Sequence, residues 1–545
     1  MATALSIDHG DPHTPLLDET IGMNLRRISS TFPAHDAVIV RSQNIRATYD
    51  DLWRDVEVTA RVLLASGIQT ADRVGVWSAN RYEWVVVQYA TARIGAILVN
   101  INPAYMRSEL GYALCQSGIR LLFHGGRFKS TEFAPLLDAV LPQCPDLERC
   151  IDFDQEWQAF LGERRADLET LAKREATLSA DDAINIQYTS GTTGLPKAAT
   201  LTHHNILNNA YHCALALRYT SADRVCVPVP FYHCFGMVLG TLAVLSVGAC
   251  LVVPSEIFQP LAVLQAIEAE RCTSVYGVPT MYRAILEHPE FDRIDVQSLR
   301  TGIMAGSPCP VELMKEVVDS LHMPEIAIGY GMTETSPLST FTQPDDSLQR
   351  RVSTVGRVMP RIEISLRDSD NQPVPRGTPG EFCARGYHVM LQYWNDLTAT
   401  KQVIDAEGWM HSGDQAVMDK DGYVHITGRL KDLIIRGGEN ISPREVEGIL
   451  ETHPAISEAQ VIGVPSHRYG EEVMAWIKFR PGRCATEAEL CAFSSERMAA
   501  FKRPRFWQFV ESFPMTVTGK IRKFQLRQTA IELLQLQSAA AEKMA

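Results

Sequence analysis

A stretch rich in hydroxyl groups and glycine, YTSGTTGLPK at residues 188–197, has the composition of a phosphate-binding loop. Its backbone amides and hydroxyls can converge on one anion, because glycine keeps bulky groups away from the turn. Lys197 adds a positive charge at the end of the stretch. The residues expected to hold phosphate oxygens are Thr189, Ser190, Gly191, Thr192, Thr193, Gly194 and Lys197. A plain surface turn is the alternative for such a stretch when it stands alone.

Two common nucleotide motifs do not fit the chain. A Walker A loop requires Gly-Lys-Ser/Thr, whereas Pro196 precedes Lys197 and Ala198 follows it. The stretch GYGMTE at residues 329–334 begins like a dinucleotide fingerprint, but Glu334 stands where the third glycine is required. Both departures disfavour a P-loop phosphotransferase and a Rossmann dehydrogenase.

Further motifs follow in a fixed order. They are GYGMTETSP at 329–337, SGD at 412–414, GRLKDLIIRGGENISP at 428–443 and PMTVTGKIRK at 514–523. Together with the stretch at 188–197, their order and separations resemble the adenylate-forming family of acyl-CoA synthetases, luciferases and peptide-synthetase adenylation domains. The resemblance runs from about Tyr49 to Lys523, and four ordered motifs are far more specific than any one of them.

The resemblance implies that the chain activates a carboxylic acid with ATP, releases pyrophosphate and passes the acyl group to CoA. Lys520 matches the lysine that bridges the substrate carboxylate and the α-phosphate. Thr333 is expected to hydrogen-bond the α-phosphate, and Glu334 offers a hard oxygen ligand for Mg²⁺. His233 matches a position beside the acyl carboxylate, although a core histidine is an equal alternative without the family.

The remaining expected contacts also come from these motifs. Tyr330, between two glycines, could stack on adenine, and Asp414 could bind the ribose hydroxyls. Arg429 is carried over as a ribose or phosphate contact, and Lys431 aligns with the hinge of the family. The glycines expected to lie against the nucleotide or the pantetheine arm of CoA are Gly329, Gly331, Gly437 and Gly438.

The pattern of elements predicts an α/β fold. Helix-length segments alternate with short apolar strands over the first 350 residues, which indicates largely parallel sheets. The clearest strands are expected at 72–78, 95–101, 120–125 and 249–253. From about Thr354 short strands are broken by Gly and Pro, which suits a small β-barrel or a distorted sheet.

After Arg429 the sequence predicts a compact α+β segment. It contains strands at 432–438 and 458–465 and a helix at 442–454 that has Ser442 at its N-cap and Pro443 in its first turn. The resemblance implies the same division: an N-terminal domain at 1–430 with two αβα subdomains and a β-barrel at about 354–430, then a mobile C-terminal domain at 431–545.

Composition restricts the partners. The net charge of −12 argues against a nucleic-acid partner, since a phosphate backbone demands a basic face. Twelve cysteines without a CxxC pair fit reduced thiols in a cytoplasm, and the first residues read as neither a signal nor a transit peptide. The uncharged run at 235–253 is nearly long enough to span a bilayer, but three glycines interrupt it, so we expect a helix, a turn and a strand within a core. Adjacent His203 and His204 have the wrong spacing for a zinc site.

The substrate is expected to be apolar. Residues 231–237 carry no acidic group of the kind that anchors the ammonium of an amino acid in peptide-synthetase relatives. Together with the stretch at 305–310, they are expected to line the acyl tunnel. The segments at 87–103 and 304–310 are most similar to the medium-chain fatty-acyl-CoA synthetase branch, which favours a short- to medium-chain fatty acid.

Several alternatives stay open at this point. They are an aryl acid as substrate, a carrier protein or another acceptor in place of CoA, a phosphotransferase or NTPase that releases ADP, and a non-catalytic nucleotide sensor. The sequence allows a homodimer but does not indicate one.

Overall fold

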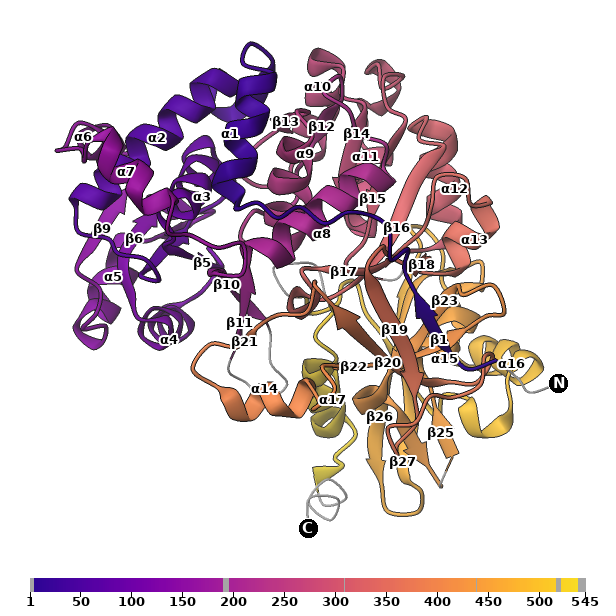
Figure 1. The fold of residues 1–545 in the computed structure, drawn as a ribbon. Coiled ribbons are helices and arrows are strands. Elements are labelled where there is room, and N and C mark those ends of the chain that lie inside the picture. The colour runs from indigo at the N-terminus through magenta and orange to yellow at the C-terminus, as the bar shows by residue number, and fades with distance from the viewer. Residues whose placement is uncertain (1–3, 190–195, 308, 438, 516–520, 538–545) are drawn as a thin grey trace. The chain divides into compact units, whose positions relative to one another are not determined.

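The computed structural model describes residues 4–189, 196–307, 309–437, 439–515 and 521–537. The chain divides into two compact units (Figure 1). The larger unit comprises Asp8–Ile364 and Ala384–Met410, and the smaller unit comprises Met1–Ile7, Ser365–Cys383 and His411–Ala545.

A seven-stranded sheet forms the first part of the larger unit. Its strand order is β21 (Gln392–Tyr393), β11 (Lys197–Thr202), β10 (Ala183–Thr189), β5 (Ile97–Ile101), β4 (Arg73–Trp77), β6 (Ile119–His124) and β9 (Arg149–Asp152). The pairs from β10 to β9 are parallel, whereas β10–β11 and β11–β21 are antiparallel. The predicted strands at 72–78, 95–101 and 120–125 are confirmed as β4, β5 and β6.

A nine-stranded sheet forms the second part. Its order is β18 (Arg357–Val358), β17 (Leu338–Phe341), β16 (Glu325–Gly331), β15 (Thr301–Met304), β14 (Ser274–Gly277), β12 (Arg224–Cys226), β13 (Cys250–Val253), β2 (Asp36–Val40) and β3 (Ile45–Thr48). The pairs from β16 to β2 are parallel, and the strands at both edges are antiparallel. The predicted strand at 249–253 is confirmed as β13.

Helices cover both faces of the seven-stranded sheet. In Figure 1, β5, β6 and β9 lie between α2, α3 and α7 on one side and α4 and α5 on the other. The helices of the larger unit are α1 (Ile21–Thr31), α2 (Tyr49–Ala65), α3 (Tyr82–Ile94), α4 (Arg107–Ser117), α5 (Ala134–Val140), α6 (Trp157–Leu161), α7 (Leu168–Glu175), α8 (His203–Ala216), α9 (Ala243–Ser246), α10 (Pro260–Glu270), α11 (Pro279–Leu286), α12 (Val311–Ser320), α13 (Leu348–Ser353) and α14 (Leu397–Val403). This arrangement confirms the α/β architecture.

Local sequence explains where key helices begin. Helix α2 starts with a capping box, in which the Thr48 hydroxyl accepts from the Asp51 amide and the Asp51 carboxylate accepts from the Thr48 amide. Helix α8 begins in the same way with Thr202 and Asn205. Helix α8 directly follows β11, so its N-terminal cap fixes the end of that strand.

The uncharged run at 235–253 folds as expected, as a helical segment, a turn and a strand. A π-helix spans Phe235–Leu242, α9 continues it, and β13 follows. All of the residues in the π-helix and α9 are buried in the larger unit. Among the described residues, no helix combines the length and the apolar character needed to cross a bilayer.

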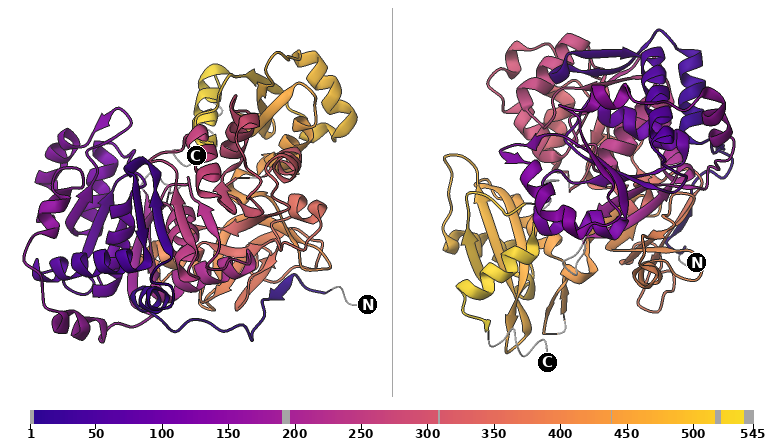
Figure 2. Two further views of the ribbon diagram at one scale, coloured as in Figure 1. Left: turned by 90° about the horizontal axis from the view of Figure 1, so that it is seen from above. Right: turned by 90° about the vertical axis from the view of Figure 1, so that its left-hand side faces the viewer.

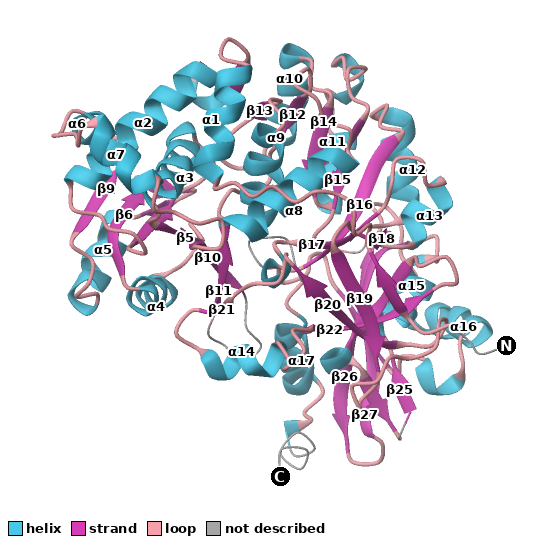
Figure 3. Cartoon of the chain, in the orientation of Figure 1, coloured by secondary structure: helices cyan, strands magenta, loops and turns pink. Residues whose placement is uncertain are grey.

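Beyond residue 354, short strands replace the α/β alternation (Figure 3). A five-stranded sheet has the order β1 (Ile7–His9), β19 (Ile362–Arg367), β20 (Gly380–Gly386), β22 (Met410–Met418) and β23 (Val424–Arg429). The adjacent strands β20 and β22 carry the SGD motif and residues that contact it. The prediction of short strands in this region is confirmed.

The C-terminal part of the smaller unit has its own core. Strands β25 (Glu439–Ile441), β24 (Ile434–Arg436), β27 (Gly470–Phe479) and β26 (Ile456–Ser466) form a sheet, to which β28 (Phe506–Phe509) adds on β27. The helices are α15 (Pro443–Glu451), α16 (Glu487–Arg497) and α17 (Lys523–Leu533), and α17 lies against the sheet in Figure 2. Leu526 and Ala530 of α17 pack with Ile462 and Val464 of β26. The predicted α+β character is confirmed.

The start of α15 differs from the expectation in one respect. Ser442 occupies the N-cap and Pro443 lies in the first turn, as predicted, but the Ser442 side chain makes no capping hydrogen bond. Its hydroxyl donates instead to the carbonyl oxygen of Thr427 in β23. The side chain therefore bonds the start of α15 to β23, which lies earlier in the chain than β24 and β25.

Candidate active site

The ends of the predicted phosphate-binding loop lie on a β-hairpin. Strands β10 and β11 are antiparallel, and Thr189 at the end of β10 pairs with Lys197 at the start of β11. The loop residues between them, Ser190, Gly191, Thr192, Thr193 and Gly194, lie outside the described residues. The described strands therefore bring both ends of the loop together, as a compact anion-binding turn requires.

The second motif meets this hairpin. Glu334 lies in a short 3₁₀ turn, Thr333–Thr335, a few residues after β16, and only 5% of it is exposed. Its carboxylate accepts a hydrogen bond of 2.8 Å from the Tyr393 hydroxyl and one of 3.3 Å from the Thr189 hydroxyl. The two predicted motifs are thus in direct contact, although 145 residues separate them.

Tyr393 connects the groups of this site and was not predicted. Its ring centroid lies 4.9 Å from the Lys197 ammonium, and its hydroxyl donates to Glu334. Burial, together with the adjacent negative charge of Glu334, raises the pKa of Tyr393 well above its ordinary value, so the hydroxyl stays a donor. Position 393 belongs to the two-residue strand β21, which pairs with β11. The sequence signal was the aromatic pair YW at 393–394, which is weak on its own.

His233 lies in the turn before the π-helix. Its Nδ1 accepts a hydrogen bond of 3.2 Å from the backbone amide of Phe235, which orients the ring. The next residue, Cys234, is buried and has its sulfur 3.6 Å from the Thr333 hydroxyl. The turn with His233 is therefore adjacent to the second motif. The predicted place of His233 beside the acyl carboxylate stays a prediction.

Gly236 is required where this turn meets the π-helix. A Cβ atom at this position would lie 2.2 Å from the Pro230 carbonyl oxygen, far inside any allowed contact. In this turn the Gly236 amide donates to the His233 carbonyl at 2.9 Å. A larger residue would displace the turn that holds His233.

Buried amide side chains of β5 and β10 contact the turn that holds His233. Asn185 donates to Asn100 at 3.0 Å, and Gln187 donates to Asn185 at 2.8 Å, in the adjacent strands β5 and β10. The Asn100 amide lies 3.4 Å from the carbonyl oxygens of Phe231 and Tyr232, and both Asn100 and Gln187 contact the Met237 sulfur. These residues were also missed, and the signal was three polar residues inside the otherwise apolar strands ILVNI and INIQYT.

The glycines around Tyr330 have a packing role. A Cβ at Gly331 would lie 1.8 Å from the Pro337 carbonyl oxygen, and one at Gly329 would lie 2.6 Å from the Leu338 side chain. Both glycines let β17 approach β16 closely, and Tyr330 between them is half-buried. This packing is compatible with the predicted adenine contact but does not require it.

The predicted ribose contacts lie together in the smaller unit. Asp414 on β22 pairs in register with Arg429 on β23, and the Arg429 Nε lies 3.0 Å from the Asp414 carboxylate. The Asp414 side chain is 14% exposed and the Arg429 side chain 49%. This ion pair across two adjacent strands fixes the direction of the Asp414 carboxylate.

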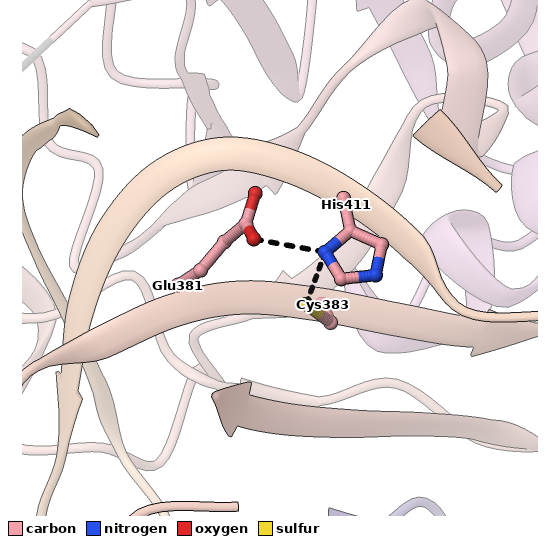
Figure 4. Close-up of side chains that lie close together, drawn as sticks. All are labelled: Glu381, Cys383 and His411. Atoms are coloured by element: carbon pink, nitrogen blue, oxygen red, sulfur yellow. Dashed lines mark hydrogen bonds and ion pairs between the residues drawn. The ribbon is translucent and has the colours of Figure 1, made fainter. Parts of the chain in front are cut away.

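The segment of β22 that carries Asp414 is held by Glu381, a residue that was not predicted (Figure 4). One Glu381 oxygen lies 2.8 Å from His411 Nδ1, and the other accepts from the Gly413 amide at 2.9 Å. The Ser412 hydroxyl donates to the Phe382 carbonyl at 2.6 Å and accepts from the Asp414 amide at 3.1 Å. Gly413 has a φ of +71°, which favours glycine. Glu381 is therefore a positioning residue for the β22 segment at 412–414.

Glu381, Cys383 and His411 also form a possible set of metal ligands. One ligand atom from each lies within 4.8 Å of the others, and the Cys383 sulfur is 3.4 Å from His411 Nδ1. Both Glu381 oxygens, however, already accept hydrogen bonds, from His411 and from Gly413. The hydrogen bonds explain the cluster without an ion.

Replacing Glu381 by glutamine tests the positioning role. The hydrogen bonds from His411 and Gly413 end on different oxygens of Glu381. In glutamine one of these two atoms is an amide nitrogen, so the side chain can accept from His411 or from Gly413 but not from both. We expect the Kd for ATP, measured by isothermal titration calorimetry, to rise about tenfold, since one lost hydrogen bond to a charged group is worth about 1.5 kcal/mol. The KM for the acid should not change. Glu487→Gln on the exposed face of α16 is the matched control, and an unchanged ATP affinity in Glu381→Gln would contradict the role.

The remaining predicted residues belong to the C-terminal segment. Lys431 lies in a short 3₁₀ turn, Leu430–Asp432, directly after β23. Gly437 has a φ of +61°, and its amide donates to the Tyr469 carbonyl at 2.8 Å, so it forms a tight turn. Gly438 and Lys520 lie outside the described residues.

The structure also describes His203, one of the two adjacent histidines whose spacing is wrong for a zinc site. His203 is buried, its Nδ1 accepts from the Ile21 amide at 3.2 Å, and burial lowers its pKa to about 3. It is a neutral core histidine at the start of α8. Among the described residues, the cluster at Glu381 is the one group whose atoms are close enough for a metal ion.

Comparisons with known proteins identify the family of the chain. The AMP-binding enzyme family matches residues 25–394, and the AMP-binding enzyme C-terminal domain matches residues 445–520. YngI of Bacillus subtilis (strain 168) is 44% identical over 546 residues, which cover 96% of this chain and 99% of that protein. The mitochondrial medium-chain acyl-CoA ligase ACSF2 of Danio rerio is 41% identical over 546 residues, which cover 95% of this chain and 90% of that protein.

A solved structure shares the fold over nearly the whole length. The anthranilate CoA ligase AuaEII, in complex with anthranoyl-AMP, superimposes with a TM-score of 0.85 at 27% identity, covering 95% of this chain and 98% of that one. The family match covers well over half of the chain, and both relatives exceed 40% identity. The chain belongs to the AMP-binding enzyme family.

Proposed function

We propose that the protein is an ATP-dependent acyl-CoA synthetase. In the first half-reaction, a carboxylate oxygen attacks the α-phosphorus of ATP, a P–O bond forms, and pyrophosphate leaves with the bridging oxygen. In the second, the sulfur of CoA attacks the acyl carbon, a C–S bond forms, AMP leaves, and the thiol proton passes to solvent. The protein must hold the triphosphate and stabilise the charge that develops at the α-phosphorus.

The proposal rests on one observation: Tyr393 contacts residues of both predicted phosphate motifs, 188–197 and 329–337. Glu334 accepts hydrogen bonds from Thr189 and Tyr393, and the Tyr393 ring lies beside Lys197. This arrangement gathers a cation, hydroxyls and a buried carboxylate at the ends of β10, β11 and β16. Such a set suits a nucleotide triphosphate and its metal ion.

Each group has a proposed role. Thr189, Lys197 and the loop between them hold the β- and γ-phosphates, and Thr333 binds the α-phosphate. Asp414 and Arg429 contact the ribose, and Tyr330 stacks on adenine. His233 lies beside the acyl carboxylate. Lys520 neutralises the charge shared by this carboxylate and the α-phosphate.

Glu334 fits a magnesium ion. Among the residues that the structure describes, its carboxylate takes hydrogen bonds from two hydroxyls and forms no ion pair. A buried carboxylate without a cation is a hard oxygen donor of the kind that Mg²⁺ prefers. When bound, the ion would neutralise the charge of the phosphates, while Tyr393 and Thr189 keep the Glu334 side chain in place.

We propose that the second half-reaction uses the boundary between the domains at 1–430 and 431–545. Lys431 is the proposed hinge, and Gly437 and Gly438 would allow the pantetheine arm of CoA to pass close to the backbone. Gly437 occurs in a left-handed turn, which is compatible with this role.

The proposed substrate is a short- to medium-chain fatty acid. The turn before the π-helix and the first residues of that helix are apolar, since Phe231 in the turn and Phe235 and Met237 in the helix are buried. The name of the Danio rerio relative gives a medium-chain acid. An aryl acid is the second candidate, because AuaEII acts on anthranilate according to its name. Twelve cysteines without regular spacing favour a reducing compartment, the cytoplasm.

The test is acid-dependent exchange of labelled pyrophosphate into ATP, with straight-chain acids of increasing length and several aryl acids. We expect exchange with medium-chain acids and, when CoA is added, one AMP for each thioester formed. Exchange without any CoA-dependent thioester would indicate a carrier protein or another acceptor. Release of ADP, or no exchange with any acid together with no binding of ATP, would overturn the proposal.

A further inference from the structure

Two cysteines in the larger unit have their sulfur atoms close together. Cys115 lies in the last turn of α4, and Cys144 follows the short turn at 141–143. Their sulfurs are 2.7 Å apart, although 29 residues separate them in the chain. Cys144 is buried, and Cys115 is half-buried with its sulfur 3.0 Å from the Gln143 carbonyl. The proposed reaction uses neither thiol.

The surroundings of this pair lead to the nucleotide-binding hairpin. Gln116, next to Cys115, accepts a hydrogen bond from the Tyr188 hydroxyl at 2.8 Å and donates to the Trp394 carbonyl at 2.6 Å. Tyr188 directly precedes Thr189, and Trp394 directly follows Tyr393. Thr189 and Tyr393 are the two residues whose hydroxyls hold Glu334. Gln116, the residue after Cys115, therefore bonds to the direct sequence neighbours of both residues that support the Glu334 carboxylate.

We propose that Cys115 and Cys144 form a reversible intrachain disulfide, with a low-molecular-weight disulfide as the oxidant, and that this bond weakens the binding of ATP. The effect on ATP rests on the proposed function, but the formation of the bond does not. A disulfide bond is about 2.0 Å long, so the sulfurs need to approach by less than 1 Å.

The reaction is a balanced thiol–disulfide exchange. The Cys115 thiolate attacks one sulfur of the oxidant, its S–S bond breaks, and one thiol leaves. The Cys144 sulfur, after losing its proton, then attacks the Cys115 sulfur, and the second thiol leaves. The oxidant is reduced to two thiols, and the two cysteines are oxidised to one disulfide.

Accessibility and burial set the order of these steps. Burial, together with the adjacent Cys115 thiol, raises the pKa of Cys144 to about 12. Cys144 is therefore protonated at neutral pH, and the more accessible Cys115 reacts first. The second step needs deprotonated Cys144, so the rate of bond formation should increase as the pH rises from 7 to 9.

Bond formation draws Cys115 and Cys144 together and shifts the last turn of α4. Gln116 lies in the same turn and has both of its polar atoms engaged, so a shift of this turn changes its contacts with Tyr188 and Trp394. We expect the oxidised protein to bind ATP about fivefold more weakly than the reduced protein, at the lower end of typical coupling between sites.

The experiment uses the full chain with Cys484→Ser and Cys491→Ser, because these two thiols are exposed and would react with the oxidant. The protein is treated with oxidised glutathione, and tryptic peptides are analysed by mass spectrometry with and without reduction. We expect a linked pair of peptides that contain Cys115 and Cys144 and that separate on reduction. ATP affinity of both forms is measured by calorimetry, and dithiothreitol should restore the reduced value.

Two single variants provide the controls. Cys144→Ser keeps the accessible thiol, so it should gain one glutathione at Cys115 and form no linked peptide. Cys115→Ser should form neither product and should keep its ATP affinity after treatment with the oxidant. Linkage of Cys115 or Cys144 to Cys150 instead would overturn the proposal, as would the absence of a linked peptide. An ATP affinity that is the same within twofold in the oxidised and reduced protein would overturn it as well.

Discussion

Glutamine in place of Glu334 should lower acid-dependent pyrophosphate exchange by about 10²–10³-fold. The amide oxygen of glutamine can still accept the hydrogen bonds of Tyr393 and Thr189, so the fold of this region should be kept. What is lost is the negative charge that is proposed to bind Mg²⁺ next to the phosphates. Electrostatic groups of this kind typically contribute about 3–4 kcal/mol to lowering the barrier.

The measurement is the exchange rate at saturating acid over a range of Mg²⁺ concentrations. The variant should need more Mg²⁺ for half-maximal rate, and its melting temperature should match that of the unchanged protein. Tyr393→Phe is the matched control, because it keeps the charge and removes one hydrogen bond to it. We expect this control to lose only about tenfold in rate. An exchange rate of Glu334→Gln within tenfold of the unchanged protein, with the same Mg²⁺ dependence, would rule out the assigned role.

Alanine in place of Lys520 should have a similarly large effect, but on one half-reaction only. The ammonium is proposed to neutralise charge between the carboxylate and the α-phosphate, so pyrophosphate exchange should fall by about 10²–10³-fold. Thioester formation from a preformed acyl-adenylate and CoA does not use this contact and should proceed at nearly the same rate.

Both half-reactions are therefore measured separately for the Lys520 variant. Lys401→Ala, which removes an exposed charge from α14, is the control for a general loss of positive potential. If Lys520→Ala exchanges pyrophosphate normally, the lysine is not part of the adenylation step. If it loses both half-reactions equally, Lys520 acts in positioning the C-terminal segment rather than in the first step.

The parts of the site that lie within short motifs could be predicted from the sequence. Thr189, Lys197, Thr333 and Glu334 each lie in a stretch whose residue types already suit phosphate or Mg²⁺. The strands β10 and β16, which lead into these motifs, were not among the strands predicted from the sequence. Asp414 and Arg429, both predicted as nucleotide contacts, form an ion pair across β22 and β23, and their contact with a nucleotide stays a prediction.

The supporting residues could not be predicted, because their role depends on contacts between distant parts of the chain. Tyr393 acts on a carboxylate 59 residues away, and Asn185 donates to Asn100 across 85 residues. A single tyrosine or asparagine in a strand gives no local sign of its partner. The role of Glu381 could not be predicted for the same reason, because it depends on two hydrogen bonds to residues of β22 about 30 positions later.

The hydrogen-bonded amide side chains of Asn100, Asn185 and Gln187 restrict how the substrate specificity of this protein can change. Asn100 bonds to the carbonyl oxygens of Phe231 and Tyr232 before the π-helix. Gln187 lies on β10, the strand that leads into the proposed phosphate-binding hairpin, and contacts the Met237 sulfur within the π-helix. Substrate preference can therefore be altered most easily by substitutions that change side chains and leave the backbone before the π-helix in place. A variant that reshaped this backbone would also disturb the hairpin that is proposed to bind the triphosphate, so selection for a new acid would favour substitutions that leave these amide residues unchanged.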